Sequence, residues 1–307
     1  MDHLSQKDTP LISVIMPVYN SESFLAEAIE SILNQTVRDF EFLIVYDESN
    51  DRSLSIIEYY QRQDPRISLI NGQKKGLIGA LNQGINAVRG EFIARMDADD
   101  ISLPERFEKQ LKLMESARAD VCGCHWLVIN ETGKLTEARI APLCRDAFTI
   151  FLMCAVPFPH GSVMMRTSFI REHALEYGGS KYAECAEDYD LWIKFFENGG
   201  VFIAVNEILF KYRDSSASLS KQRSKKIASD CKKIRRFFVR HNQETCLHAV
   251  HKLTNNYTDL SRDERDYLLM ASYILSVNCK QSIIFNVLKN SSAKNIGLFL
   301  FRWLRGI

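Results

Sequence analysis

Three carboxylates fall within four consecutive positions of this chain, at Asp97, Asp99 and Asp100. Like charges this close destabilise a folded protein unless a cation or hydrogen bonds compensate them. The apolar run before them, residues 92–96, predicts a buried strand. Because open α/β sheets bind ligands beyond the carboxyl ends of their strands, Asp97 and Asp99 are candidates for holding a divalent metal with a diphosphate.

A second interpretation of the same segment is an acidic loop that caps the next helix. Asp100, Ser102 and Pro104 have the composition of a helix start. Short motifs often match by chance, so the elements around the segment must decide between the two interpretations.

Alternating strand and helix patterns precede the acidic segment. Apolar, β-rich runs at residues 12–20, 40–47 and 67–70 predict strands, and helical patterns follow them from residue 21, through residue 60 and over residues 79–88. Such alternation with short connections predicts an α/β fold, a mainly parallel, Rossmann-like sheet flanked by helices. Tyr19, Asp47 and Asp97 then all stand at strand ends, where one crevice can gather them.

The order of several motifs resembles the family 2 glycosyltransferases, which have the GT-A fold. The resemblance covers roughly the first two-thirds of the chain, and the ordered set is far more specific than any single motif. The motifs are residues 14–20, residues 31–36, the strand that ends at Asp47, residues 76–90, residues 97–100, residues 186–192 and residues 211–213.

The resemblance implies a role for individual residues. Pro17, Tyr19 and Asp47 would shape the pocket for the nucleotide base, and Asp97 would join them in nucleotide binding. Asp97 and Asp99 would form the motif for the metal and diphosphate. Asp188 would be the catalytic base of an inverting transfer.

Two departures from the family pattern limit this transfer of roles. The second strand of the family usually ends in two aspartates and a glycine, whereas this chain has Tyr46, Asp47 and Glu48. A histidine often follows the motif that ends at Arg213, whereas this chain has Ser215 at that place. No role of that histidine is therefore carried over.

The acceptor region contains three further candidates, Glu187, His160 and Arg213. His160 lies in a turn-rich segment and is a candidate contact for acceptor or phosphate, with a structural role in closing the turn as the alternative. Glu187 and Asp188 begin a helical pattern, where carboxylates ordinarily act as caps, and the resemblance favours Asp188 as the base. Arg213 is a candidate partner of the diphosphate, or else one half of a structural ion pair.

The chemistry follows from these roles. Hard carboxylate oxygens favour Mn²⁺ or Mg²⁺ over zinc, and the cation would neutralise charge on the departing diphosphate. The expected donor is a UDP-sugar, and the expected acceptor is a lipid-linked saccharide of a bacterial surface polysaccharide such as O-antigen or capsule. The competing classes are a sugar nucleotidyltransferase, whose glycine-rich loop is missing after the first strand, and a non-catalytic nucleotide-sugar or membrane-binding scaffold.

Length and composition are those of a globular enzyme. The chain has 307 residues, 46% of them hydrophobic, which is enough for a sizeable core in one or two domains. Eight cysteines are scattered without a CxxC spacing, and a polar N-terminus lacks a secretory leader. We therefore expect buried thiols and a cytoplasmic location.

Charge is divided unevenly along the chain. Residues 221–307 hold 17 Lys and Arg against 6 Asp and Glu, a net charge of +11, whereas residues 1–220 hold 22 against 32, a net charge of −10. We expect a catalytic domain over residues 1–220 and a basic helical region over residues 221–307. No nucleic-acid motif accompanies the charge.

The basic region favours a peripheral site on an anionic membrane, at the inner face of the plasma membrane. Residues 221–240 are rich in Lys and Arg, and residues 296–305 combine aromatic and aliphatic residues with arginine. The alternative is a helical subdomain whose apolar face packs on the core and whose basic face is solvated.

Overall fold

The computed structural model describes residues 9–180, 185–216, 218–256 and 259–279. The strands in this part of the chain are β1 Ile12–Val18, β2 Phe40–Tyr46, β3 Ile67–Asn71, β4 Phe92–Arg95, β5 Ile101–Ser102, β6 Val121–Ile129, β7 Leu135–Arg139, β8 Met164–Arg166 and β9 Phe202–Arg213. The helices are α1 Leu25–Leu33, α2 Ser53–Gln63, α3 Gly76–Ala87, α4 Arg106–Ala117, α5 Arg145–Cys154, the short 3₁₀ helix η1 His160–Ser162, α6 Thr167–Glu172, α7 Glu187–Glu197, α8 Leu219–Gln222, α9 Ser224–His241, α10 Gln243–Asn255 and α11 Arg262–Cys279.

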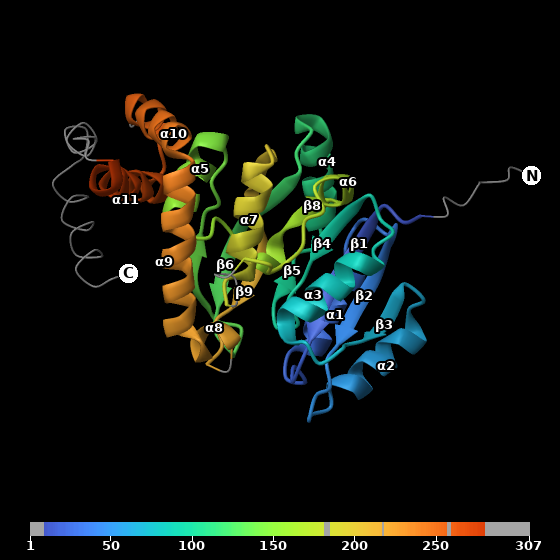
Figure 1. Ribbon diagram of the computed structural model, residues 1–307. Helices are drawn as coiled ribbons and strands as arrows, with labels where there is room; N and C mark the ends of the chain where they lie inside the picture. Colours follow the sequence, from blue (N-terminus) through green and yellow to red (C-terminus); the bar gives the residue numbers. More distant parts are fainter. Residues whose placement is uncertain (1–8, 181–184, 217, 257–258, 280–307) are drawn as a thin grey trace, which may run out of the picture.

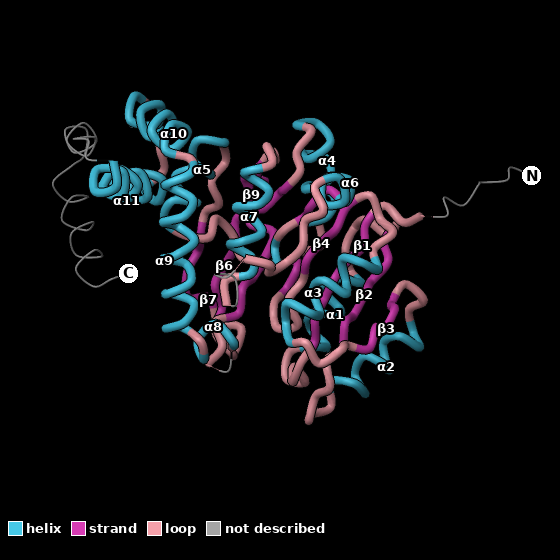
Figure 2. Tube along the Cα trace, in the orientation of Figure 1, coloured by secondary structure: helices cyan, strands magenta, loops and turns pink. Residues whose placement is uncertain are grey.

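One mixed sheet runs through the molecule, with helices in front of and behind it (Figure 2). The strand order is β3-β2-β1-β4-β8-β6-β9-β5, and β7 pairs with β6 beside this path. The half formed by β3, β2, β1 and β4 is parallel, as is the pair β6 and β9. By contrast, β8 is antiparallel to β4 and β6, and β5 is antiparallel to β9. The parallel half brings the ends of β1, β2 and β4 to one edge.

The central strands are apolar on both faces, because helices cover both faces. Every residue of β2 is buried, and β1 is buried apart from Pro17. Alternate residues enter two different cores: Ile15 and Leu43 pack with α3, α5 and α7, whereas Val14 and Phe42 pack with α1, α2 and α4. This double burial holds the strand ends firmly in register, and the site depends on that register.

The C-terminal helices pack on the body of the protein rather than extending from it. Ile234 and Phe238 of α9, Val250 of α10 and Leu268 of α11 belong to the same hydrophobic core as Phe151 of α5. Figure 1 shows α9 along one side of the molecule, with α8 at its lower end and α10 and α11 beside its upper end. The predicted helical extension is present, and the predicted interfacial segment, residues 296–305, lies outside the described residues.

The predicted strands and helices of the N-terminal half are confirmed, and one alternative is wrong. The segment from Asp100 to Pro104 does not begin a helix, because Ile101 and Ser102 form β5 and α4 begins at Arg106. The strands β6 and β7 and the helix α5 were not predicted from the sequence.

The cysteines only partly match the expectation of buried thiols. No disulfide is found in the described part of the chain, and Cys122, Cys124, Cys154 and Cys246 are buried. Cys144 is exposed, however.

Candidate active site

The register of the parallel strands brings four predicted residues to the same edge of the sheet. Ile15 of β1 lies opposite Arg95 of β4, so Pro17 and Asp97, each two residues further on, end the two strands side by side. Asp47 follows β2 at the matching level, and its backbone N–H donates to the carbonyl of Val18 at 2.9 Å. Tyr19 comes directly after Val18.

Backbone and side-chain hydrogen bonds tie the loops after β1 and β2 together. The backbone N–H of Asn20 donates to Ser49 Oγ, and the backbone N–H of Asn50 donates to Asn20 Oδ1, both at 2.9 Å. The Tyr19 side chain projects from this framework and is 55% exposed. An exposed ring on a fixed backbone is suited to contact with a planar base.

The Asp47 carboxylate is fixed by the loop after β3. Its Oδ1 accepts from the backbone N–H of Lys74 at 3.0 Å. A Cβ added at Gly72 would lie 2.6 Å from the same oxygen, so this close approach requires glycine. The unexpected acid Glu48 pairs with the Lys74 ammonium at 2.7 Å on the exposed surface. Asp47 thus keeps a partly exposed oxygen acceptor at the edge.

The carboxylates after β4 are crowded and poorly compensated. Burial and the neighbouring Asp97 raise the pKa of Asp99 to about 6, and burial together with Asp97 and Asp99 raises the pKa of Asp100 well above its usual value. Asp100 is buried and accepts from the backbone N–H of Arg213 at 2.7 Å, while its other oxygen has no hydrogen-bond partner. The side chain of Asp97 is 29% exposed and forms an ion pair with the buried Arg95.

These residues fit a hard divalent cation. Among the described residues, no three His, Cys, Asp or Glu side chains form a ready-made metal cluster. Mg²⁺ and similar ions are commonly held by one or two carboxylates together with substrate phosphates, so a complete protein cage is not needed. Asp97 and Asp99 supply partly exposed carboxylates in a place where negative charge is in excess.

Asp188 and Glu187 face the same group of charges from the start of α7. Asp188 Oδ1 accepts from the backbone N–H of Tyr189 at 2.7 Å. Burial raises the pKa of Asp188, and its electrostatic neighbours include Arg95 and Asp97. Burial and Asp188 raise the pKa of Glu187 to about 7. Two carboxylates with raised pKa values therefore lie near the carboxylates that follow β4, where a proton acceptor is useful.

His160 is buried and already has a partner. Its Nε2 lies 2.6 Å from the hydroxyl of Tyr177, and burial lowers the pKa of His160 well below its usual value, which keeps the ring neutral. Its ring also lies edge-on to the core residue Trp192. The geometry agrees with the structural alternative for His160. The neighbouring Gly161 lies against the acidic site, because a Cβ added to it would be 3.0 Å from Asp97 Oδ2.

Arg213 holds the acidic segment in place through hydrogen bonds to Asp99 and Asp100. Its Nε donates to the Asp99 carbonyl at 2.8 Å and its Nη2 to Glu27 at 2.5 Å, and its guanidinium lies over the Phe24 ring. These contacts match the structural ion pair rather than a free diphosphate ligand. Ser215, at the place of the family's histidine, donates to Glu131 at 3.2 Å.

Three residues that the sequence analysis did not single out belong to this site: Arg95, Gly161 and Tyr177. Arg95 ends an otherwise apolar strand, and its charge was not interpreted from the sequence. An arginine in a strand that is buried on both faces is a usable signal, since an isolated buried charge is costly and needs a partner.

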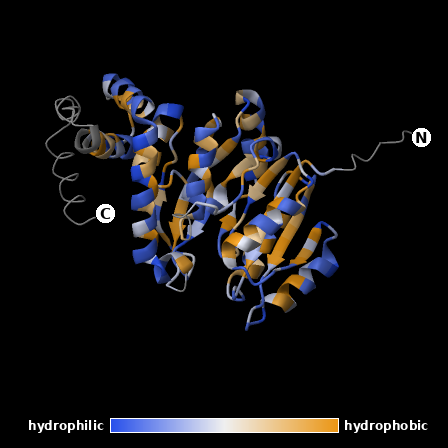
Figure 3. Ribbon diagram, in the orientation of Figure 1, coloured by the Kyte–Doolittle hydropathy of each residue, from blue (hydrophilic) through white to orange (hydrophobic). Residues whose placement is uncertain are grey.

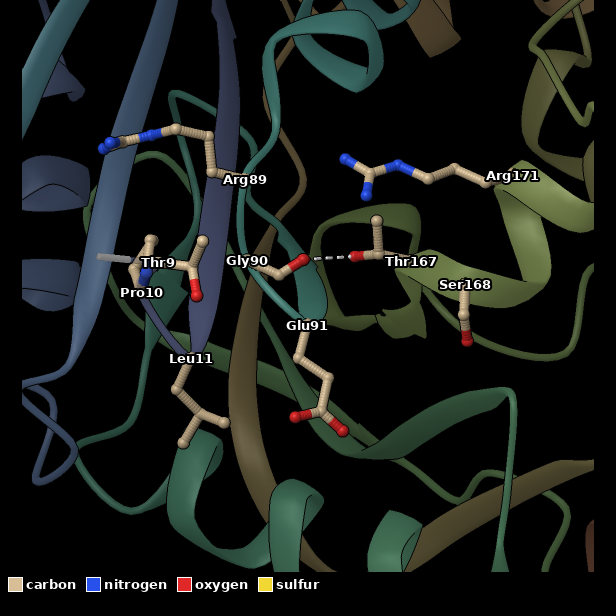
Figure 4. Close-up of a pocket in the computed structure, with 9 residues that line it drawn as sticks. All are labelled: Thr9, Pro10, Leu11, Arg89, Gly90, Glu91, Thr167, Ser168 and Arg171. Atoms are coloured by element: carbon tan, nitrogen blue, oxygen red, sulfur yellow. Dashed lines mark hydrogen bonds between the residues drawn. The ribbon is translucent and has the colours of Figure 1, made fainter. Parts of the chain in front are cut away.

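A hollow of about 400 Å³ lies at the opposite ends of the same strands (Figure 4). The residues that line it include Thr9, Leu11, Arg89, Thr167 and Arg171. It is built around the chain entering β1 and β4, whereas the predicted residues follow the carboxyl ends of those strands. The hollow is therefore separate from the candidate active site.

Comparison with known proteins gives a consistent result for the family. The family model described as Glycosyl transferase family 2 matches residues 13–173. The putative glycosyltransferase EpsE of Bacillus subtilis (strain 168) is 38% identical over 216 residues, which are 69% of this chain and 76% of EpsE. The O-antigen biosynthesis glycosyltransferase WbnJ of Escherichia coli is 30% identical over 223 residues, which are 71% of this chain and 85% of WbnJ.

Two solved structures share the fold at low sequence identity. S. aureus TarS 1–349 in complex with UDP-GlcNAc has a TM-score of 0.58 and 18% identity, covering 90% of this chain and 89% of that one. The mannosyltransferase PcManGT from Pyrobaculum calidifontis, in complex with GDP-Man and Mn²⁺, has a TM-score of 0.54 and 16% identity, covering 96% of this chain and 80% of that one.

Proposed function

The chain belongs to glycosyl transferase family 2, and we propose that it moves a sugar from a nucleotide-diphosphate sugar onto a saccharide acceptor with inversion of configuration. The observation that carries the proposal is the grouping of Asp97, Asp99 and Asp188 beside the exposed Tyr19 and the fixed Asp47. One edge of the sheet would then combine a base-binding part, a diphosphate part and a proton acceptor.

The donor would lie across the ends of β1, β2 and β4. Pro17 and Tyr19 would contact the base, and Asp47 would accept a hydrogen bond from it. Asp97 and Asp99 would hold Mn²⁺ or Mg²⁺, which when bound neutralises negative charge on the departing diphosphate. A UDP-sugar is our expected donor, and the neighbour structures with UDP-GlcNAc and GDP-Man support the class of donor.

Asp188 would carry the proton chemistry. Its carboxylate removes the hydroxyl proton of the acceptor while that oxygen attacks the anomeric carbon, and the diphosphate leaves from the opposite face. A single displacement with one base and no enzyme nucleophile inverts the anomeric configuration. Glu187, next to Asp188, would contact the acceptor. His160 and Arg213 would have structural roles next to the site.

We further propose that the acceptor is a lipid-linked saccharide of surface polysaccharide synthesis. The names of relatives support this assignment, since WbnJ is an O-antigen biosynthesis glycosyltransferase and AmsE of Erwinia amylovora, 31% identical over 217 residues, is an amylovoran biosynthesis glycosyltransferase. No helix in the described part of the chain has the length and apolar character needed to cross a membrane. A lipid-linked acceptor would instead be met at the membrane surface.

The surface that would meet the membrane is one face of α9. Six of its basic side chains are exposed, and at about 100° per residue they fall within an arc of about 120° that contains no acidic residue. They are Lys225, Lys226, Lys232, Lys233, Arg236 and Arg240. Figure 3 shows hydrophilic residues recurring along α9.

Apolar and catalytic neighbours favour a membrane over nucleic acid for this basic face of α9. Phe237 of α9 and Leu219 of α8, the helix that precedes it, are 40% and 43% exposed, and exposed apolar side chains on basic helices are typical of interfacial helices. The inner side of α9 reaches the acceptor end of the site, because Asp188 is an electrostatic neighbour of Cys231. Within this proposal, residues 1–220 form the catalytic domain and residues 221–307 the membrane-facing helical region.

Sedimentation with liposomes tests the membrane surface separately from catalysis. Changing Lys225, Lys232 and Arg236 together to Gln should lower binding to liposomes of phosphatidylglycerol and phosphatidylcholine roughly 10²-fold, since each basic residue contributes about 1 kcal/mol. The matched control changes three exposed basic residues elsewhere, Lys112, Lys134 and Arg139. Equal binding by the two triple variants, or binding to nucleic acid alone, refutes the membrane assignment.

A panel of UDP-, GDP- and dTDP-sugars tests the catalytic proposal. Purified protein should release the nucleoside diphosphate from one donor class when Mn²⁺ is present and lose this activity in EDTA. Asp99→Ala should lose it as well, while keeping the wild-type melting temperature within a few degrees. Binding of nucleotide sugars without turnover, in the presence of saccharide acceptors, would instead support the scaffold alternative.

A further inference from the structure

Arg95 is a buried cation aimed at one carboxylate of the candidate active site. It is the last residue of β4, its side chain is 3% exposed, and its Nη1 forms an ion pair with Asp97 Oδ2. Its Nε is buried and has no hydrogen-bond acceptor among the described residues. The backbone N–H of Arg95 donates to Val163 at 2.9 Å, which fixes the base of the side chain.

The other two buried arginines near this edge have different partners. Arg106 donates to the carbonyls of Gly161 and Arg95, at 2.5 Å and 3.3 Å. Arg213 donates to the Asp99 carbonyl and to Glu27. Both are therefore occupied with the framework. Arg95 alone among these three pairs with a carboxylate that the proposed function assigns to the metal.

The charges around Arg95 are mostly negative. Burial by itself would lower the pKa of Arg95, but neighbouring acidic groups, Asp97 first, raise it above its usual value. The guanidinium charge also acts on Asp99, Glu187 and Asp188. Arg95 thus acts as the internal counter-ion of the acidic site in the protein without ligand.

We propose that Arg95 is the counter-ion that Asp97 exchanges for the divalent metal when the donor binds, a step that rests on the proposed function. A guanidinium and a divalent cation compete for the same carboxylate, and their mutual repulsion is strong in a poorly solvated site. A free divalent metal ion is repelled by the full guanidinium charge. The complex of the metal with the diphosphate of a nucleotide sugar has no net charge there, so the guanidinium repels it far less.

Arg95 is in this account a positioning residue that makes metal binding depend on the donor. Arg95 offsets part of the negative charge of the site without ligand, and free metal binds only weakly.

Titration of Mn²⁺ without nucleotide, followed by the electron paramagnetic resonance signal of the free ion, tests the exchange. Arg95→Met should bind Mn²⁺ at least tenfold more tightly than the wild type, whereas a merely structural role would weaken binding. Arg95→Lys keeps the charge and should bind Mn²⁺ like the wild type. Arg89→Met, which breaks an arginine pair with Glu41 at the opposite strand ends, is the matched control and should change nothing.

Two results would overturn the exchange. One is an affinity of Arg95→Met for Mn²⁺ that is equal to or weaker than that of the wild type. The other is a crystal structure with Mn²⁺ and nucleoside diphosphate in which Arg95 Nη1 stays within about 4 Å of Asp97 Oδ2. This second experiment uses the wild type, so it decides the question even if Arg95→Met does not fold. Failure of the wild type to bind Mn²⁺ even with nucleotide would instead count against the proposed function.

Discussion

Replacing Asp188 by Asn separates the proposed base from an ordinary helix cap. The change removes the carboxylate charge and keeps the shape and one acceptor oxygen. That oxygen can still accept from the backbone N–H of Tyr189, the 2.7 Å hydrogen bond at the start of α7. Loss of a like charge beside Glu187 also relieves repulsion. We therefore expect Asp188→Asn to fold with an unchanged or slightly higher melting temperature.

The kinetic effect should be large in comparison. A positioned general base contributes about 10²- to 10⁴-fold in rate, so kcat should fall at least 10²-fold, which corresponds to about 2.7 kcal/mol of transition-state stabilisation. The donor contacts lie at the ends of β1, β2 and β4, so donor affinity should stay within a few-fold of the wild type. A loss in kcat with unchanged donor binding is the signature of a group that acts only in the transition state.

The assay is single-turnover transfer with saturating donor and acceptor, with donor affinity measured separately by calorimetry. Asp190→Asn is the matched control, because Asp190 lies on the same helix and pairs with Lys194 rather than with the acidic site. That variant should keep near-wild-type kcat in the folded fraction. Near-normal kcat in Asp188→Asn, together with a large loss in Glu187→Gln, would assign the base to Glu187 and refute this part of the mechanism.

Two further predictions concern the acidic site and its wall. Folding raises the pKa of Asp99 to about 6 and of Glu187 to about 7, so the folded state favours the protonated forms of both carboxyl groups. The free energy of unfolding of the metal-free protein should therefore fall by roughly 1–3 kcal/mol as the pH rises from 5 to 8. Mn²⁺ with nucleoside diphosphate should raise the melting temperature more at pH 8 than at pH 6. An equal rise at both pH values would contradict the charge account. Gly161→Ala places a Cβ 2.8 Å from the Phe210 ring and 3.0 Å from Asp97 Oδ2. The variant should lose about 1–3 kcal/mol of unfolding free energy and bind nucleotide more weakly in the presence of Mn²⁺. The control is Gly133→Ala, where a Cβ meets nothing within 4 Å and nucleotide binding should stay intact.

The sequence predicted the parallel half of the fold because its signals are local. Each strand from β1 to β4 is an apolar run with turn residues after it, and parallel strands end at one edge, so Tyr19, Asp47 and Asp97 could be placed together in advance. The strands β6 and β7 escaped prediction. All five residues of β7 are exposed, so the strand has no apolar periodicity to reveal it, and it pairs with β6 beside the main path of the sheet.

The contacts beneath the site could not be predicted because they join distant segments. Arg213 meets Glu27 across 186 positions and Asp100 across 113, and neither pairing leaves a local pattern. The same applies to His160 and Tyr177, whose hydrogen bond favours a structural role for the histidine. Arg95 was visible in the sequence, but its ion pair with Asp97 depends on the direction of its side chain in β4.

If Asp97 and Asp99 hold a divalent metal together with the donor diphosphate, nucleoside diphosphate should bind only when the metal and both carboxylates are present, and calorimetric titration measures this. The titrant is the nucleoside diphosphate of the sugar donor that the protein uses. Three samples are compared: wild type with Mn²⁺, wild type with EDTA, and Asp99→Ala with Mn²⁺. We predict clear binding in the first sample and at least a tenfold loss of affinity in the other two. Equal affinity in all three would contradict the assignment of the metal site.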